Sequence, residues 1–229
     1  MAEQHPVLVL LSKAQFMTSA PRLSACPPGI GHEVAFVGRS NAGKSSAINA
    51  LTRQRQLARA SKTPGRTQLL NFFGLDDERR LVDLPGYGYA AVPEAMKIAW
   101  QKELQNYLLK RDSLRGLMLL MDIRHPMLNY DVEMLKWAQA GKLPVHILLT
   151  KCDKLNRGPA MTTVQEVAKK LKEQGLTATI SLFSALRGVG MEEAADKLGE
   201  WLHYPPEETE VIPEANTGAE GSASPARHR

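Results

Sequence analysis

Residues 38–45 read Gly-Arg-Ser-Asn-Ala-Gly-Lys-Ser, and this octapeptide constrains the fold more than any other part of the chain. An apolar run at 34–37 precedes it, and a helix-like stretch at 46–51 follows it. In that context a G-x-x-x-x-G-K-S string binds phosphate, because backbone N–H groups and the positive end of the helix converge on one point. The segment therefore predicts a strand, a glycine-rich turn and a helix that together bind a nucleoside triphosphate.

Strand-like and helix-like runs alternate through the middle of the chain, which is typical of a mostly parallel sheet with helices on both faces. The predicted strands are 33–37, 69–75, 80–83, 117–121, 145–150 and 177–183. The predicted helices are 44–52, 93–111, 130–140, 161–174 and 190–203. In the helix at 93–111, Met96 and Trp100 fall on the same face as Leu104, and we expect that face to be buried. The predicted fold class is α/β, with a six-stranded sheet in three α/β/α layers.

The segments that flank this central region at 33–204 differ from it in composition. Residues 1–32 are rich in Pro and Gly toward their end, which predicts a short element around 7–16 and then an extended linker. Residues 205–229 carry five Glu and two Arg with almost no large apolar side chains, which predicts a disordered acidic tail. Of the 29 Lys and Arg, 27 lie outside that tail, against 19 of the 24 Asp and Glu. This basic balance favours a polyanionic partner such as nucleic acid.

Composition also limits the cellular setting and the kinds of site. No apolar run approaches the length of a bilayer span, so we expect a cytoplasmic protein without membrane insertion. We also expect a monomer. The two cysteines, Cys26 and Cys152, agree with a reducing compartment and offer neither a disulfide framework nor a metal cluster.

Residues 83–86 read Asp-Leu-Pro-Gly and follow a predicted strand, some 40 residues after the phosphate loop. An aspartate at the end of a strand can hold a Mg²⁺-bound water, and the N–H of Gly86 can meet the γ-phosphate. From the first motif, Lys44 is expected to reach the β- and γ-phosphates and the Ser45 hydroxyl to bind Mg²⁺. The two motifs together predict a phosphate and Mg²⁺ site.

Residues 150–153 read Thr-Lys-Cys-Asp at the end of a predicted apolar strand, and they select the base. The carboxylate of Asp153 can accept two hydrogen bonds from guanine, at N1–H and at the 2-amino group. Adenine has an unprotonated N1 at that place, so the carboxylate would be left without a donor. The stem of Lys151 can pack along the base. Ser184 and Ala185 follow the last predicted strand, where the Ala185 N–H can donate to guanine O6.

The segment at 53–68 contains five basic residues and no acidic one, with a Pro-Gly turn inside it. A loop of this length in a compact domain is usually functional. It lies where a GTPase senses the γ-phosphate, so one of its threonines should complete the Mg²⁺ shell in the GTP state. We prefer Thr67 to Thr63, because Thr67 lies two residues before the predicted strand.

These motifs, with Asn-Phe-Phe at 71–73 and Pro-Gly-Tyr-Gly-Tyr-Ala at 85–90, resemble the EngB family of bacterial ribosome-assembly GTPases and, more loosely, its Era and TrmE relatives. The resemblance covers roughly residues 5–204. It implies a Ras-like P-loop fold, GTP hydrolysis, a role in maturing the large ribosomal subunit, and a requirement for normal cell division and septation. The partners that it implies are GTP or GDP and the large ribosomal subunit, through rRNA and ribosomal proteins.

Carried over to this chain, the resemblance implies catalytic roles for Lys44, Thr67 and Gly86, and Mg²⁺ ligands at Ser45 and Thr67. In relatives, an asparagine at the position of Asn41 helps to hold a potassium ion beside the phosphates. The residues implied to bind the nucleotide are Gly38, Arg39, Ser40, Asn41, Ala42, Gly43, Lys44, Ser45, Ser46, Gly65, Arg66, Thr67, Gln68, Leu69, Asp83, Leu84, Pro85, Gly86, Thr150, Lys151, Cys152, Asp153, Phe183, Ser184 and Ala185.

Small GTPases commonly place a glutamine directly after D-x-x-G to orient the attacking water, but here Gly86 is followed by Tyr87. We therefore expect slow intrinsic turnover, about 10⁻⁴ s⁻¹, which a cation near Asn41 or a partner that orders the loop at 62–68 would accelerate. Tyr87 and Tyr89 are interpreted as residues that pack and hinge this segment. Two alternatives stay open: a P-loop kinase, and a GTP-dependent scaffold at the septum without ribosomal binding.

Overall fold

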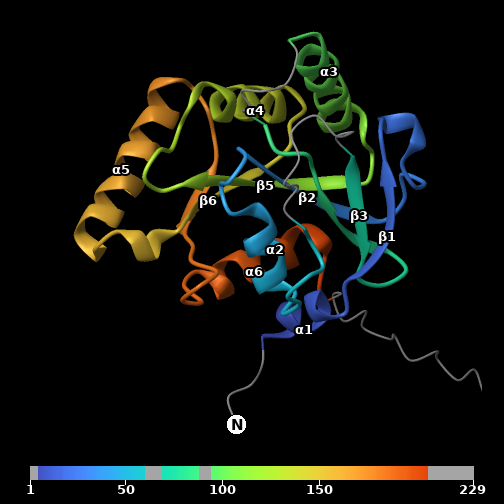
Figure 1. Cartoon of the computed structure of the whole chain (residues 1–229), viewed down its shortest axis with the longest axis horizontal. Coiled ribbons are helices and arrows are strands. Elements are labelled where there is room, and N and C mark those ends of the chain that lie inside the picture. The colour runs from blue at the N-terminus through green and yellow to red at the C-terminus, as the bar shows by residue number, and fades with distance from the viewer. Residues whose placement is uncertain (1–4, 60–68, 88–93, 206–229) are drawn as a thin grey trace, which may run out of the picture.

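A computed structural model describes residues 5–59, 69–87 and 94–205 of the chain. Within these ranges seven strands form one sheet in the order β1-β3-β4-β2-β5-β6-β7 (Figure 1). The strands are β1 (Gln15–Ala20), β2 (His32–Gly38), β3 (Leu70–Gly74), β4 (Arg79–Asp83), β5 (Leu114–Asp122), β6 (Val145–Thr150) and β7 (Thr179–Leu182). The α-helices are α1 (Pro6–Ser12), α2 (Lys44–Leu51), α3 (Glu94–Lys110), α4 (Asn129–Ala140), α5 (Arg157–Glu173) and α6 (Met191–Leu202). Short 3₁₀ turns lie at η1 (Leu23–Ala25) and η2 (Cys152–Lys154).

Helices cover both faces of a mostly parallel sheet (Figure 1). Strands β2, β4, β5, β6 and β7 run parallel, whereas β3 pairs antiparallel with β4 and with β1. One core holds side chains of α3, α4 and α5, for example Leu104 and Val167, and the other holds those of α1, α2 and α6, for example Ile48 and Leu198. The predicted α/β class is thereby confirmed. No helix in the described ranges is long and apolar enough to cross a bilayer.

The expected count of six strands was wrong, because β1 lies mostly in the segment that the sequence pattern marks as an extended linker. β1 is an edge strand: Gln15 pairs with Gly74 and Ala20 pairs with Leu70, with a register shift after Phe16. Its first three residues are exposed, so it lacks the apolar alternation that marks a half-buried strand. Backbone pairing with β3 holds it in place, and the side chains give little sign of that pairing.

Two helices differ from their predictions for physical reasons. α5 begins at Arg157 rather than at residue 161, because Asn156 takes the extended backbone of an N-cap and Pro159 fits within the first turn. In α3, Leu104 is buried as predicted, whereas Met96 is 47% exposed. The predicted burial of Met96 was therefore wrong: the core of α3 begins beyond its first turns.

The parallel strands bring their carboxyl ends to one edge of the sheet. Phe36 on β2 pairs with Asp83 on β4, and Asp122 on β5 pairs with Thr150 on β6. Residues that follow these strands are therefore neighbours in space, although they lie far apart in sequence. Ligands of open α/β sheets bind at this edge.

Candidate nucleotide-binding site

The turn between β2 and α2 holds the octapeptide at 38–45 in a conformation that needs its glycines. Gly43 has φ 92° and directly precedes α2, a left-handed conformation that glycine adopts without strain. A Cβ at Gly38 would lie 2.7 Å from the carbonyl oxygen of Leu120 on β5, so this position also requires glycine. Since Gly43 has no side chain to cap α2, the N–H groups of the first helical turn can bind an anion.

An ion pair joins the two phosphate-side motifs. Lys44, the first residue of α2, contacts the carboxylate of Asp83 at the end of β4. The two side chains are 13% and 7% exposed, so the pair is largely shielded from water. Ser45 follows Lys44 on the same helix. An ammonium group, a carboxylate and a hydroxyl thus come from neighbouring positions, a donor set that suits a phosphate with its Mg²⁺.

The segment after β4 packs its backbone against the phosphate loop. The Ser40 N–H donates to the Tyr87 carbonyl at 2.8 Å, and the Tyr87 N–H donates to the Gly38 carbonyl at 3.4 Å. A Cβ at Gly86 would lie 3.5 Å from the same Gly38 oxygen, an ordinary contact. Leu84 is fully buried, so its side chain belongs to the core and not to a ligand site.

Tyr87 anchors this segment to α4. Its ring is 2% exposed, and its hydroxyl donates to Asp131 Oδ1 at 2.5 Å. The other oxygen of that carboxylate accepts the Leu128 N–H at 2.8 Å. Burial raises the pKa of the Tyr87 hydroxyl and also that of Asp131. Because the hydroxyl is bound to α4, the interpretation of Tyr87 as a packing residue is confirmed, whereas Tyr89 lies outside the described residues.

The loop after β6 is tied to the phosphate loop by two side chains. Thr150 Oγ1 donates to the Ala42 carbonyl at 2.6 Å. Lys151 Nζ donates to the Asn41 carbonyl at 2.6 Å. The loop with the base-selecting pattern and the loop with the phosphate-binding pattern are therefore held in a fixed relation to each other.

Asp153 carries the carboxylate that is expected to select the base. Ser184 Oγ donates to its Oδ1 at 2.5 Å, and this hydrogen bond lowers the pKa of Asp153. An ionised carboxylate only accepts hydrogen bonds, which matches the two donors on the edge of guanine. Ser184 is itself fixed by a backbone bridge to Val189, so the turn after β7 holds the donor in place.

Asp122 was missed as a site residue. At the end of β5, its Oδ2 accepts a hydrogen bond from Lys151 Nζ at 3.0 Å. The Arg124 guanidinium donates to both carboxylate oxygens, at 2.9 and 2.7 Å, and holds the pKa of Asp122 well below its usual range. Its position in the sequence could have indicated it, because it directly follows the predicted strand at 117–121. The predicted strands before and after that one, at 80–83 and 145–150, both end in a motif.

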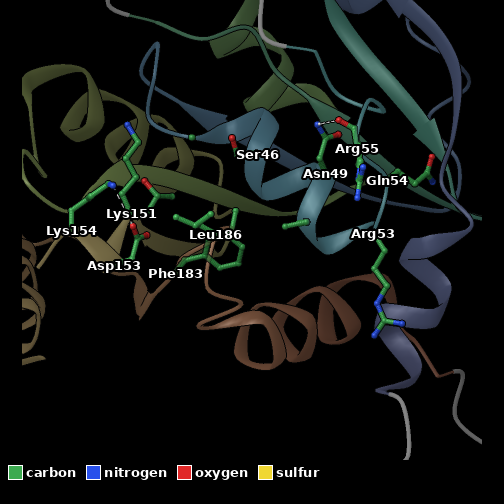
Figure 2. A pocket seen from close by; sticks show the side chains of 14 residues that line it. Ser46, Asn49, Arg53, Gln54, Arg55, Lys151, Asp153, Lys154, Phe183 and Leu186 are labelled. Atoms are coloured by element: carbon green, nitrogen blue, oxygen red, sulfur yellow. Dashed lines mark hydrogen bonds and ion pairs between the residues drawn. The ribbon is translucent and has the colours of Figure 1, made fainter. Parts of the chain in front are cut away.

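A cavity of about 640 Å³ opens between α2 and the loops after β6 and β7 (Figure 2). Figure 2 shows Lys151, Asp153 and Phe183 on one side and Ser46 and Asn49 of α2 on the other. The volume lies within the range of small-molecule and cofactor sites. The predicted site residues that line this cavity are Gly43, Ser46, Thr150, Lys151, Asp153, Phe183 and Ala185.

Gly65, Arg66, Thr67 and Gln68 lie outside the described residues. Leu69, directly before β3, is half-buried. The Mg²⁺ role of Thr67 therefore stays a prediction.

Known proteins with similar sequences are GTP-binding proteins. The family model described as 50S ribosome-binding GTPase matches residues 33–151. A probable GTP-binding protein EngB from Acinetobacter baumannii is 59% identical over 204 residues, which cover 86% of this chain and 97% of the relative. A protein of the same name from Acinetobacter baylyi is 62% identical over 187 residues, or 81% of this chain and 79% of the relative.

Solved structures with similar folds have lower sequence identity. The crystal structure of a probable GTP-binding protein engB has a TM-score of 0.61 at 20% identity and covers 75% of this chain and 98% of that chain. The crystal structure of Era in complex with MgGDPNP and nucleotides 1506-1542 of 16S ribosomal RNA has a TM-score of 0.56 at 20% identity, with 75% and 57% covered. At this identity the two structures support the fold.

Proposed function

This chain belongs to the EngB family of GTP-binding proteins, and on that basis we propose that it is a GTP-driven switch in assembly of the large ribosomal subunit. The resemblance expected from the motifs is thereby confirmed. As a GTPase of this family, the chain binds GTP and hydrolyses it to GDP and phosphate. The proposed site is the edge of the sheet where Lys44, Asp83 and Asp153 converge, and that convergence is the observation that carries the proposal.

The base end of the proposed site is built around Asp153. Its ionised carboxylate, held by Ser184 at 2.5 Å, accepts the N1–H and 2-amino donors of guanine. Lys151, fixed between the Asn41 carbonyl and Asp122, lays its aliphatic stem along the base. A base without those two donors would leave the buried part of the carboxylate unpaired, which explains the preference for guanine.

A Mg²⁺ ion fits the groups at the phosphate end. Ser45 supplies a hydroxyl, and Asp83 supplies a carboxylate that can hold a Mg²⁺-bound water. Such a sparse set of oxygens suits Mg²⁺, which keeps several waters and takes other ligands from phosphates. When bound, the ion neutralises negative charge on the phosphates. Thr67 is the proposed second hydroxyl ligand, and Lys44 exchanges its contact with Asp83 for the β- and γ-phosphates.

Hydrolysis transfers the γ-phosphoryl group to water and leaves GDP, so the residues of the chain position and stabilise charge. Lys44 and the Gly86 N–H are the proposed groups that stabilise the transferring phosphoryl. Because the hydroxyl of Tyr87 is held by Asp131, the residue after D-x-x-G does not orient the water. We therefore expect about 10⁻⁴ s⁻¹ for the chain alone, and faster turnover when potassium binds near Asn41 or when a partner engages residues 62–68.

The proposed partner of the switch is the large ribosomal subunit. The formal net charge of +5 includes an acidic tail, so the rest of the chain is more basic still, as binding to rRNA requires. The matching family model is described by its binding to the 50S ribosome. The corresponding site of action is the cytoplasm, and the requirement for cell division and septation is proposed to follow from this role.

Co-sedimentation with purified large subunits tests this function. The full chain is loaded with GDP or with a non-hydrolysable GTP analogue and sedimented across a salt series, with Lys44→Ala as the variant that cannot hold the triphosphate. Binding that needs the analogue, fails in Lys44→Ala and weakens steeply with salt is the expected result. Absence of binding in both nucleotide states would contradict the ribosomal role and favour a septal scaffold.

A further inference from the structure

A second cavity, of about 740 Å³, lies between the loop that follows α2 and the paired strands β1 and β3. Phe16 of β1, Phe73 and Asn71 of β3, and Arg55 and Arg59 of the loop line it. We propose that this cavity binds an unstacked base of single-stranded RNA together with its flanking phosphates. This inference depends on the proposed ribosomal role in one respect, namely that the ribosome is the source of the RNA.

The aromatic part of the cavity is exposed yet held in place. Phe16 is 59% exposed, while Phe73 is 2% exposed and belongs to the core. Their ring centroids lie 6.2 Å apart at an interplanar angle of 67°, an edge-to-face contact that supports the Phe16 ring from one side. An exposed ring supported in this way is a stacking platform, and stacking tolerates any base because every base has a π-face.

The basic part of the cavity is preorganised by hydrogen bonds to the backbone of the loop. The Asn49 amide of α2 donates to the carbonyls of Arg55 and Ala58, at 3.2 and 2.9 Å, and accepts the Ala58 N–H at 2.8 Å. Figure 2 shows Asn49 with its bond to Arg55. Arg55 and Arg59, both exposed, are therefore carried on a loop whose shape is set before any ligand arrives.

A further side chain ties the basic loop to the aromatic strand. The Gln54 amide donates to the carbonyls of Ser12 and Ala14, at 3.2 and 2.7 Å, directly before β1 begins. The backbone that carries the arginines is thus tied to the residues directly before β1. Two arginines and an aromatic ring in one lining, together with Gln56 and Asn71, suit phosphates that flank a base. An acidic peptide would use the arginines but not the stacking platform.

The cavity also reaches the proposed nucleotide site. Asp83, which pairs with Lys44, is part of its lining. The helix α2 connects the two sites as well, because it begins at Lys44 in the phosphate loop and carries Asn49, which shapes the basic loop. A change at the phosphates can therefore alter the RNA cavity through one helix and one carboxylate.

Fluorescence anisotropy with a labelled single-stranded oligouridylate tests the inference on the full chain. Phe16→Ala should weaken binding about tenfold, and Phe16→Tyr should restore it, because stacking needs the ring. Arg55→Ala and Arg59→Ala should each reduce the slope of log affinity against log salt by about 0.7. Met17→Ala removes another exposed apolar side chain of β1, and Lys169→Ala removes a charge on α5, so both should bind as the unmodified chain does.

Equal RNA affinities of Phe16→Ala and Met17→Ala would overturn the inference. Displacement of the RNA by polyglutamate to the same extent from Phe16→Ala as from the unmodified chain would overturn it as well. Unchanged GDP binding by Phe16→Ala shows that the variant is folded. Large-subunit sedimentation separates this inference from the proposed function. Phe16-dependent binding of free RNA without subunit binding supports the cavity and contradicts the ribosomal role. Subunit binding that ignores Phe16 contradicts the cavity alone.

Discussion

Replacing Tyr87 with Phe removes one hydroxyl and keeps the ring, so it isolates the hydrogen bond to Asp131. In the native protein, both carboxylate oxygens of Asp131 have a donor, at 2.5 Å from Tyr87 and at 2.8 Å from the Leu128 N–H. Asp131 is 2% exposed, so water cannot easily replace the lost hydroxyl. A hydrogen bond to a charged group contributes about 1.5–3 kcal/mol, and we expect the free energy of unfolding to fall by about 2 kcal/mol.

The cost of Tyr87→Phe should depend on pH. Burial raises the pKa of Asp131 above the ordinary 3.8, and the hydrogen bond from Tyr87 partly opposes that rise. Without the hydroxyl, the pKa rises further, so the native state binds a proton that the unfolded chain does not. A raised carboxyl pKa lowers stability as pH rises from the unfolded to the folded value. The variant should therefore lose less stability near pH 4 than at neutral pH.

Urea denaturation measures the stability change, and GTP turnover measures the functional one. Tyr130→Phe is the matched control, because this substitution also removes a tyrosine hydroxyl and keeps the ring. The Tyr130 ring lies 6.0 Å from the Tyr87 ring, between their centroids. We expect Tyr87→Phe to be destabilised relative to this control while its turnover stays within about twofold. Loss of a catalytic proton-transfer group typically costs about 10² to 10⁴ in rate. Unchanged stability, or a hundredfold loss of turnover, would refute the assignment of Tyr87 as an anchor.

Three further outcomes follow from the remaining contacts. Glu33 is fully buried against two arginines, with Arg111 Nη2 2.6 Å from its carboxylate, so Glu33→Ala should lower the free energy of unfolding in urea by about 3 kcal/mol. Burial lowers the pKa of His146 to about 4 from the ordinary 6.5, so the unfolded chain takes up the proton first. The free energy of unfolding should therefore fall by about 3 kcal/mol as the pH drops from 6.5 toward 4. Urea denaturation at several pH values should show that His146→Gln lacks this contribution. Asp122→Ala leaves Lys151 with only its bond to the phosphate loop, so GDP affinity by fluorescence titration should fall about three- to tenfold, without a change in base preference.

Much of the fold could be predicted because four of the parallel strands, β2, β4, β5 and β6, are largely buried on both faces. Apolar runs such as 145–150 therefore stand out in sequence, and β6 spans the predicted residues. β1 could not be predicted in the same way, because an edge strand is held by backbone pairing and its side chains are largely exposed. The burial expected for Met96 failed because periodicity identifies a face of α3 but not the point at which the core begins.

In the candidate site, too, some residues could be predicted and others could not. The motifs around Lys44, Asp83 and Asp153 have a fixed spacing and residue types that suit a nucleotide, so these residues could be identified from the sequence. Asp122 and Asn49 act through other residues, on Lys151 and on the loop after α2, and a single sequence does not show such contacts. Arg55 and Arg59 could be recognised in the sequence as part of a basic run, but their place in one cavity lining with Phe16 depends on the three-dimensional pairing of β1 with β3.

Asp153 is proposed to select guanine at the edge of the sheet where the nucleotide binds and is hydrolysed. Turnover of GTP and of xanthosine triphosphate by the unmodified chain and by Asp153→Asn is the measurement that tests this selection. Xanthine carries an oxygen in place of the 2-amino group, so the amide of Asn donates where the carboxylate of Asp accepts. We expect the unmodified chain to prefer GTP and Asp153→Asn to prefer xanthosine triphosphate. An unchanged preference for GTP in Asp153→Asn would contradict the proposed selection.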